Sequence, residues 1–155
     1  MIIRTVNKND IPALTELFNN CVRQIAPEKY TPEQIDAWAA STSDGESFNK
    51  FILEPTTFVA ETNNLILGFA GVTTAGYLAS LYVRGDRNRQ GIGSRLLIHI
   101  IEYARVNNIY RLYTEASVFS KPLFEKFGFA IYEEEDVTRN GIVFHRYLME
   151  KFLVN

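Results

Sequence analysis

A chain of 155 residues has the length of one domain, and its 46% hydrophobic and 13% aromatic residues can build a core, which excludes an intrinsically disordered chain. The net charge of −2, with acidic and basic residues interspersed, argues against a nucleic-acid-binding surface and against docking on an anionic membrane. The one cysteine, Cys21, excludes an internal disulfide and a cysteine-based metal cluster. We therefore expect one domain over residues 1–155 that holds no metal.

Apolar periodicity and turn residues predict strands and helices along the whole chain. Alternating or continuous apolar runs are typical of strands, and apolar residues at every third or fourth position are typical of helices. In chain order the predicted elements are a strand at 2–6, a helix carrying Leu14, Leu17, Phe18 and Cys21, a helix carrying Ile35 and Trp38, a helical turn at 48–53, strands at 57–62, 65–72 and 78–83, a helix carrying Leu96, Leu97, Ile100, Ile101 and Ala104, a strand at 112–116, a short helix carrying Leu123, Phe124 and Phe127, and a hairpin of 129–137 with 142–152.

Capping residues support several of these boundaries. Asn9-Asp10 offers an N-cap for the first helix, Thr31 with Gln34 fits a capping box for the second, and Ser120 offers a cap for the short helix. The order β-α-α-β-β-β-α-β-α-β-β predicts an α/β (α+β) fold. We expect one mixed, mostly antiparallel central sheet with helices on both faces.

The chain is organised around the strand at 78–83, whose nearly continuous apolar run predicts a strand buried on both faces, and around the polar loop and helix that follow it. Gly91 and Gly93 punctuate this loop, and Arg87 and Arg89 add positive charge beside them. Glycines allow a ligand to approach the backbone, and the first N–H groups of a helix lack intrahelical acceptors, which favours an anion. The stretch therefore predicts a pyrophosphate-binding site.

Two common phosphate motifs do not fit this loop. A P-loop needs Lys-Ser/Thr after its second glycine, whereas Gly93 is followed by Ser94-Arg95. A dinucleotide fingerprint needs a third glycine or alanine three residues beyond Gly93, where Leu96 stands.

The segment Asn88-Arg89-Gln90-Gly91-Ile92-Gly93 resembles the acyl-CoA loop of the GNAT superfamily of N-acetyltransferases, which reads Gln/Arg-x-x-Gly-x-Gly/Ala. Asn88 takes the usual Gln/Arg place, and this departure removes a phosphate charge that Arg87 or Arg89 can supply. The resemblance implies that N–H groups of residues 90–94 bind the pyrophosphate of acetyl-CoA. It also implies that the backbone of residues 81–83 pairs with the pantetheine.

A second segment also resembles this superfamily. Leu123-Phe124-Glu125-Lys126-Phe127-Gly128-Phe129 matches the family's Leu-Tyr-x-x-x-Gly-Phe on a short helix after a strand. Together with Tyr-x-Pro-Glu-Gln-Ile-x-x-Trp at 30–38, it is similar to a subgroup of bacterial N-acetyltransferases, and the resemblance covers the whole chain in order and spacing. The tyrosine of this motif, which protonates the departing CoA thiolate in many members, is Phe124 here. A thiolate with a pKa near ~8.5 is a tolerable leaving group, so the loss need not abolish transfer.

The resemblance implies direct attack of a primary amine of a small molecule on the acetyl thioester in a ternary complex. Such a reaction needs a fixed hydrogen-bond donor to the thioester carbonyl, a proton acceptor for the amine, and contact between the two substrates. A backbone N–H near Tyr82 or Val83 would serve as the donor. Weaker catalytic candidates are Glu61, Tyr113 and His145. The candidate catalytic residues are Ser117, Glu115 and Tyr82; those for acetyl-CoA are Leu81, Tyr82, Val83, Arg89, Gln90, Gly91, Ile92, Gly93, Ser94, Ser117, Lys121 and Phe124; and those for the acceptor amine are Tyr30 and Trp38.

The alternative to an enzyme is a binding module that holds acyl-CoA as a sensor or scaffold, and Phe124 keeps that alternative open. We expect no nucleic-acid or membrane partner, and a homodimer stays open. Residues 1–5 lack the basic region and long apolar core of a signal peptide, and no apolar run is long enough to span a bilayer. The sequence therefore favours a cytoplasmic protein.

Overall fold

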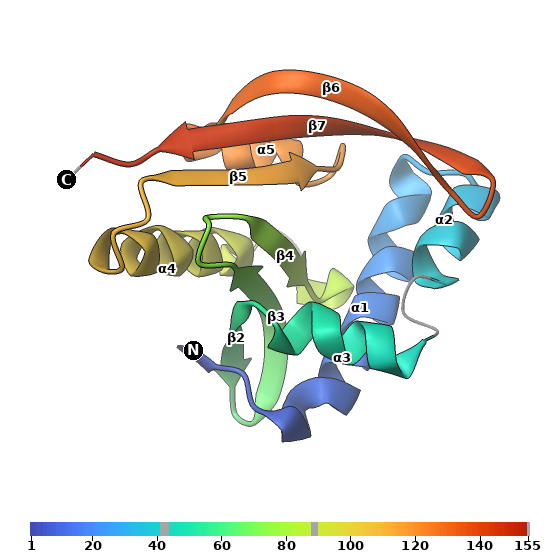
Figure 1. Ribbon diagram of the computed structural model, residues 1–155. Coiled ribbons are helices and arrows are strands. Elements are labelled where there is room, and N and C mark those ends of the chain that lie inside the picture. Colours follow the sequence, from blue (N-terminus) through green and yellow to red (C-terminus); the bar gives the residue numbers. More distant parts are fainter. Residues whose placement is uncertain (41–43, 88–89, 155) are drawn as a thin grey trace.

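The computed structural model describes residues 1–40, 44–87 and 90–154, and its elements follow the predicted order (Figure 1). The helical turn expected at 48–53 is a full helix, α3. The strands are β1 (Ile2–Thr5), β2 (Thr56–Thr62), β3 (Leu65–Val72), β4 (Leu78–Val83), β5 (Arg111–Ala116), β6 (Ala130–Arg139) and β7 (Ile142–Phe152). The helices are α1 (Ile11–Ile25), α2 (Pro32–Ala39), α3 (Gly45–Leu53), α4 (Ile92–Val106) and α5 (Lys121–Lys126), with short 3-10 turns η1 (Lys8–Asp10), η2 (Ala26–Glu28) and η4 (Gly85–Arg87).

The strands form two antiparallel sheets, where the sequence predicts a single mixed one. One sheet has the order β1-β2-β3-β4 and the other has the order β5-β7-β6. A parallel bridge between Tyr77 and Tyr113 joins them, and the Thr114 hydroxyl donates to the Leu78 carbonyl at 3.0 Å. Ala79 has no partner in β3, and this bulge bends β4 just beyond the join. Consequently β4 and β5 diverge toward their carboxyl ends.

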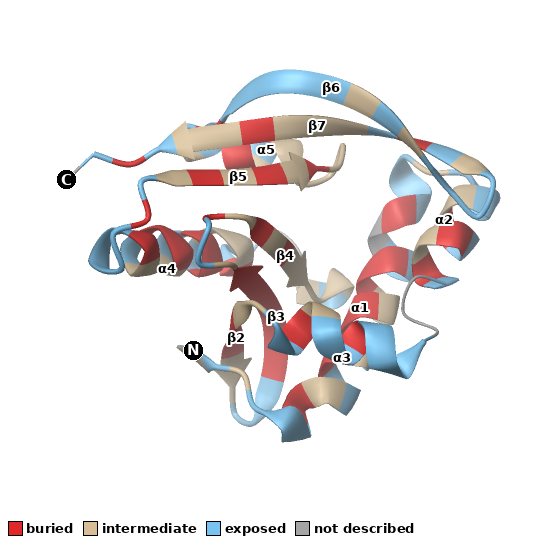
Figure 2. Ribbon diagram, viewed as in Figure 1, coloured by how far each residue is buried: buried red, intermediate tan, exposed pale blue. Residues whose placement is uncertain are grey.

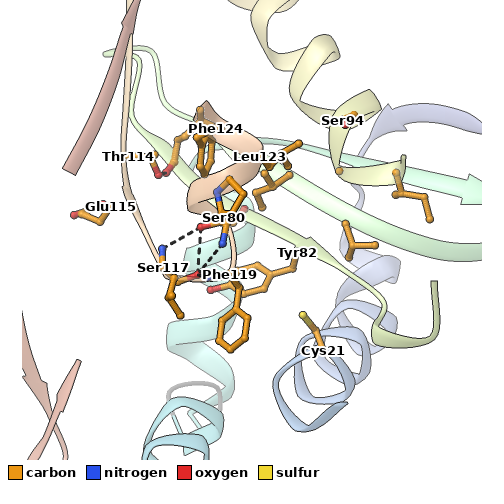
Figure 3. Close-up of a pocket in the computed structure, with 18 of the residues that line it drawn as sticks. Cys21, Ser80, Tyr82, Ser94, Thr114, Glu115, Ser117, Phe119, Leu123 and Phe124 are labelled. Carbon is orange, nitrogen blue, oxygen red and sulfur yellow. Dashed lines mark hydrogen bonds between the residues drawn. The ribbon is translucent and has the colours of Figure 1, made fainter. Parts of the chain in front are cut away.

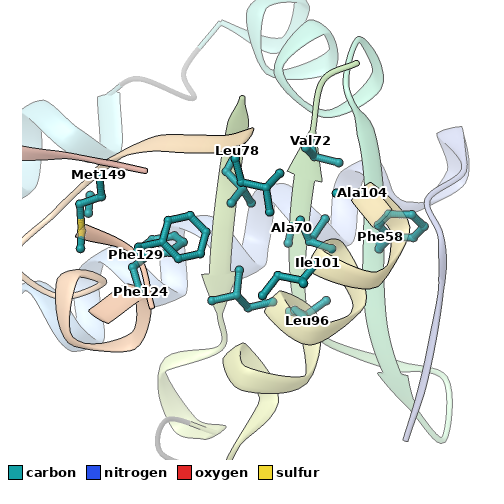
Figure 4. Close-up of a cluster of buried hydrophobic side chains, with 14 of the residues drawn as sticks. Phe58, Ala70, Val72, Leu78, Leu96, Ile101, Ala104, Phe124, Phe129 and Met149 are labelled. Atoms are coloured by element: carbon teal, nitrogen blue, oxygen red, sulfur yellow. The ribbon is translucent and has the colours of Figure 1, made fainter. Parts of the chain in front are cut away.

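Helices cover both faces of the four-stranded sheet, and each face has its own apolar cluster (Figure 2). On one face lies α4, whose predicted apolar residues are all buried against β2, β3 and β4, as Figure 4 shows for part of the cluster. On the other face α1, α2 and α3 pack their apolar residues on Val59 and Phe69. Burial of each large apolar side chain contributes roughly 1.5–3 kcal/mol, so these two clusters fix the position of β4 between them.

Two of the predicted caps are wrong, and one is confirmed. The Thr31 hydroxyl accepts from the Gln34 N–H at 3.2 Å, and the Gln34 side chain accepts from the Thr31 N–H at 3.0 Å, which completes the capping box. Asp10 occupies the N-cap position of α1 without capping it, and Asn7 instead caps the preceding turn η1, where its side chain accepts from the Asn9 N–H and the Asp10 carboxylate accepts from the Asn7 N–H. Ser120 occupies the N-cap position of α5 without capping it, because its hydroxyl accepts a hydrogen bond elsewhere.

Both hairpin turns are formed by residues with positive φ. Asn63 and Asn64 have φ of 49° and 65°, and Asn140 and Gly141 have φ of 50° and 77°. Two consecutive positive values match the twist of the flanking strands, and Asn and Gly tolerate them. These turns set the register of β2 with β3 and of β6 with β7.

Candidate active site

A cavity of about 600 Å³ lies where β4 and β5 diverge, with the starts of α4 and α5 along its sides (Figure 3). Residues 81–83 border this cavity and are therefore half-buried, whereas the sequence predicts a strand buried on both faces. Arg89 lies outside the residues that the structure describes, and Gln90 and Lys121 lie outside the described lining. The cavity brings together the remaining candidates for acetyl-CoA: Leu81, Tyr82, Val83, Gly91, Ile92, Gly93, Ser94, Ser117 and Phe124.

The open edge of β4 presents backbone groups to this cavity. The Arg84 N–H donates to the Leu67 carbonyl at 2.8 Å, and Tyr82 stands opposite Phe69. Because backbone groups alternate in direction along an antiparallel strand, the N–H groups of Tyr82 and Arg84 face β3. Those of residues 81 and 83 face the cavity. The Tyr82 N–H expected to polarise a thioester is thus engaged within the sheet.

The first turn of α4 supplies free N–H groups at one end of the cavity. Gly91 is its N-cap with a φ of +80°, and the helix provides no acceptors for the N–H groups of residues 92–94. A Cβ on Gly91 would have no heavy atom within 4 Å, so the backbone is open to a ligand there. At Gly93 a Cβ would lie 3.1 Å from the Leu123 side chain, so this glycine allows α4 to pack against α5. The half-buried Arg87 adds positive charge to the lining.

A tight serine turn joins β5 to α5 at the other end of the cavity. The Ser117 hydroxyl accepts from the N–H groups of Phe119 and Ser120, each at 3.2 Å, and the Ser120 hydroxyl accepts from the Ser117 N–H at 3.0 Å. Two N–H donors thus fix the Ser117 oxygen, and the Ser117 hydroxyl also lies 3.3 Å from the Ser120 hydroxyl, with which it can share a hydrogen bond. Phe124 is buried against Phe129, with ring centroids 5.0 Å apart, and borders the cavity.

Lys121, next to this turn, is engaged on the surface. Its ammonium lies 3.2 Å from the Glu125 carboxylate and 5.2 Å from the centre of the Tyr147 ring. The described geometry therefore gives Lys121 two partners within the protein.

A second cavity of about 310 Å³ opens on the other side of β4, under the tip of the β6–β7 hairpin. The tip is held to α2 by a hydrogen bond from the Gln34 amide to the Val143 carbonyl at 3.1 Å. Tyr30 and Trp38, the predicted acceptor residues, both line this cavity with ring centroids 5.5 Å apart. The residues shared by the two cavities mark their junction: Trp38, Tyr77, Ala79, Tyr82, Glu115 and Ser117.

A carboxylate, a phenol and a guanidinium meet at this junction. The Tyr77 hydroxyl hydrogen-bonds with the Glu115 carboxylate, and the Arg146 guanidinium lies 3.9 Å from that carboxylate. Burial, reinforced by Glu115, raises the pKa of Tyr77 far above its ordinary value, and burial raises the pKa of Tyr82 to about 12. Both phenols are therefore protonated at neutral pH and can donate protons. Sequence reasoning missed Tyr77 and Arg146, since neither belongs to a motif.

The three weaker catalytic candidates are engaged with other side chains, and two of them lie outside both described linings. Glu61 is paired with Arg4 at 3.0 Å and lines neither cavity. Tyr113 packs beside Tyr77, with ring centroids 5.3 Å apart, and is likewise absent from both described linings. His145 lines the second cavity, but carboxylates hold both of its ring nitrogens at 2.8 Å.

Cys21 borders the first cavity from α1 (Figure 3). Burial raises the pKa of its thiol to about 11, against the effect of a hydrogen bond with the Val83 backbone. At neutral pH the group is a thiol rather than a thiolate, which makes it a poor nucleophile.

The described part of the chain contains no helical candidate for a membrane span and no cluster of candidate metal ligands. Across residues 1–40, 44–87 and 90–154, no helix combines the length and apolarity that a bilayer crossing needs. Nor does this part of the chain group three or more His, Cys, Asp or Glu side chains in a way that could hold a metal ion.

The fold corresponds to that of the acyl-CoA-dependent acetyltransferases. A family model for the acetyltransferase (GNAT) domain matches residues 26–151, so the chain belongs to the GNAT family, whose members are acetyl-CoA-dependent N-acetyltransferases. An uncharacterized N-acetyltransferase of Escherichia coli K12, YafP, is 29% identical over 147 residues, which cover 95% of this chain and 93% of YafP.

Solved structures show the same fold. A GCN5-related N-acetyltransferase from Rhodopseudomonas palustris superposes with a TM-score of 0.93 at 24% identity, covering 98% of this chain and 95% of that one. The PaiA N-acetyltransferase of Thermoplasma acidophilum, solved in complex with coenzyme A, superposes with a TM-score of 0.78 at 19% identity and 98% coverage of each chain.

Proposed function

We propose that this protein transfers the acetyl group of acetyl-CoA to a primary amine of a small molecule by direct attack in a ternary complex. The observation that carries the proposal is the junction, where a thioester held in the first cavity would meet an amine held in the second. The cavities draw residues from α1 through β7, so we propose that residues 1–155 act as one domain.

The first cavity suits the charges and shape of acetyl-CoA. The N–H groups of residues 92–94 and the Arg87 guanidinium would hold the pyrophosphate, because a helix N-terminus and a cation both favour an anion. The open edge of β4 would pair with the pantetheine through the backbone of residues 81 and 83. Val83 already contacts the Cys21 thiol, so we assign the donor that polarises the thioester carbonyl to the Leu81 N–H.

Proton transfer is assigned to side chains at the junction. Glu115 would accept the amine proton, directly or through water, and the Tyr77 hydroxyl would orient its carboxylate. Ser117 is the candidate donor to the departing thiolate, because its oxygen is already fixed by two N–H groups. Tyr82 is a second donor, since its phenol stays protonated at neutral pH.

The test is incubation of the protein with acetyl-CoA, a panel of primary amines and a dye that detects free thiol. We expect CoA release that depends on the amine and yields the acetylated amine in equal amount by mass spectrometry. Binding of acetyl-CoA without release of thiol for any amine would instead support a module that only holds acyl-CoA.

A further inference from the structure

The lining of the second cavity combines aromatic rings with Arg139, a cation that has no ion pair among the described residues. We propose that it binds an aromatic primary amine carrying an anionic group at the end opposite the amine, with Arg139 as the anchor for that group. This substrate class rests on the proposed function for the acetylation itself. The binding part of the proposal can be measured independently of turnover.

Aromatic side chains from three helices and two strands form the walls. Tyr30 lies edge-on to Trp38 and to Phe144, with ring centroids 5.5 Å and 5.4 Å apart, and Phe48 and Phe51 come from α3. Phe119, outside the lining of this cavity, stacks on Trp38 with ring centroids 6.2 Å apart, so the ring surfaces that do line the cavity are those on which a ligand ring can pack. A cavity of about 310 Å³ has room for one aromatic ring with short substituents.

The basic residues of this cavity differ in their partners. Arg146 is paired with Glu135 and lies 3.9 Å from Glu115, and His145 is held by two carboxylates of β6. Arg139 also lines the cavity, from the end of β6, and has no ion pair with any residue that the structure describes. Its positive charge acts on the Tyr82 phenol at the junction, so its field extends into the cavity. Arg139 is thus the lining cation left for a ligand anion.

The position of Arg139 on β6 sets the distance between the amine and the anionic group of the proposed ligand. Glu135 stands opposite Arg146, which lies beside Glu115 at the junction. Arg139 is four residues further along the strand, which corresponds to about 13 Å between backbone positions. An arginine side chain is long enough to span part of this distance. The remaining span suits a ring with an aminoalkyl group at one end and a carboxylate at the other.

The same charges disfavour polycationic acceptors. The lining contains Arg139, which has no ion pair among the described residues, and also Arg146 and His145, whose charges are balanced by carboxylates of β6. A second ammonium on the ligand would have to lie near the aromatic walls or near Arg139, and like charges repel there. We therefore expect spermidine to be a poor substrate and a poor ligand.

The experiment compares matched acceptors. Phenethylamine has the ring and the amine, para-carboxyphenethylamine adds the distal carboxylate, and phenylalanine carries its carboxylate beside the amine. We expect kcat/KM for para-carboxyphenethylamine to exceed that for the other two by about tenfold or more, the value of one hydrogen-bonded charge contact. Equal values for the first two, or a preference for phenylalanine, would overturn the anchor.

Variants of Arg139 separate its charge from its contribution to the hairpin. Arg139→Ala should remove the preference for para-carboxyphenethylamine over phenethylamine, and Arg139→Lys should restore part of it. Arg105→Ala is the matched control, because Arg105 is an exposed arginine on α4 that lines neither cavity. It should keep the full preference. An undiminished preference in Arg139→Ala would refute the assignment.

Direct binding distinguishes failure of the anchor from failure of the proposed function. If no amine is acetylated, calorimetric titration of para-carboxyphenethylamine in the presence of CoA still tests the site. Binding that weakens about tenfold or more in Arg139→Ala would support the anchor with no chemistry involved. Absence of binding by the wild-type protein would overturn it.

Discussion

Replacement of Gly91 by alanine should weaken acetyl-CoA binding at a small cost in stability. The backbone there has φ +80°, and a Cβ would meet no heavy atom within 4 Å, so the substitution strains the backbone without a clash. Left-handed backbone costs an L-residue roughly 1–2 kcal/mol. In a chain of this length each kcal/mol corresponds to about 2–4 °C in Tm. We expect a folded variant whose Tm is lower by a few degrees.

The effect on the ligand should be larger than the effect on the fold. Relief of the strain would turn the first N–H groups of α4 away from the cavity, and one lost hydrogen bond to a charged group costs about 1.5–3 kcal/mol. This corresponds to an affinity about 10- to 100-fold weaker, measured by calorimetry with acetyl-CoA.

A matched control is available in the β6–β7 turn. Gly141 has φ +77° and also has no heavy atom within 4 Å of its Cβ position, but it does not line the first cavity. Gly141→Ala should lower Tm by a similar amount and leave the affinity for acetyl-CoA unchanged. If Gly91→Ala binds acetyl-CoA as tightly as the wild type, or if both variants weaken it equally, the assignment of the α4 N-terminus to the pyrophosphate is wrong.

Three further substitutions test the chemistry and the fold. Glu115→Gln should lower kcat/KM by about 10²–10⁴-fold, the usual contribution of general acid–base catalysis. The control Glu125→Gln, on α5, should leave kcat/KM unchanged. If Glu115→Gln and the wild type have the same pH–rate profile, Glu115 is not the general base. Phe124→Tyr adds one oxygen beside the cavity and should leave turnover unchanged or modestly higher, so a large loss would indicate that the phenyl ring is needed for packing against the cofactor. Asp10→Asn should lower the free energy of unfolding by about 2 kcal/mol at pH 7 in urea titrations. The Arg4 guanidinium holds the pKa of the Asp10 carboxyl below its usual range, so its stabilisation is present above about pH 4 and is lost as the pH falls further. The difference between wild type and Asp10→Asn should therefore shrink in acid, and a constant difference would show that charge is not its cause.

The sequence alone determined those parts of the fold that depend on local chemistry. The apolar face of α4 repeats at helical spacing, and every residue predicted on it is buried. The capping box of Thr31 and Gln34 forms as predicted, because both partners lie within one helical turn. The order of elements follows from the same periodicities. The acetyltransferase family follows from two short motifs, and a family model over residues 26–151 confirms it.

Only the tertiary structure decided how the sheet divides and what surrounds each polar side chain. The bulge at Ala79 and the short join at Tyr77 separate β4 from β5, and no local pattern predicts a pairing register between distant strands. The sequence also did not show which polar groups would pair: Asp10 bonds to Arg4 instead of capping α1, and Glu61 pairs with the same Arg4 guanidinium.

The junction of the two cavities belongs to this second category. Tyr77, Glu115 and Arg146 lie far apart in the chain and meet because the start of β4 lies beside β5, which pairs with β7. The aromatic walls and Arg139 come from α1, α2, α3, β4 and the β6–β7 hairpin, and a hydrogen bond from Gln34 helps to hold the hairpin in place. Long-range packing brings these groups together, so their chemistry could be read only after the chain was folded.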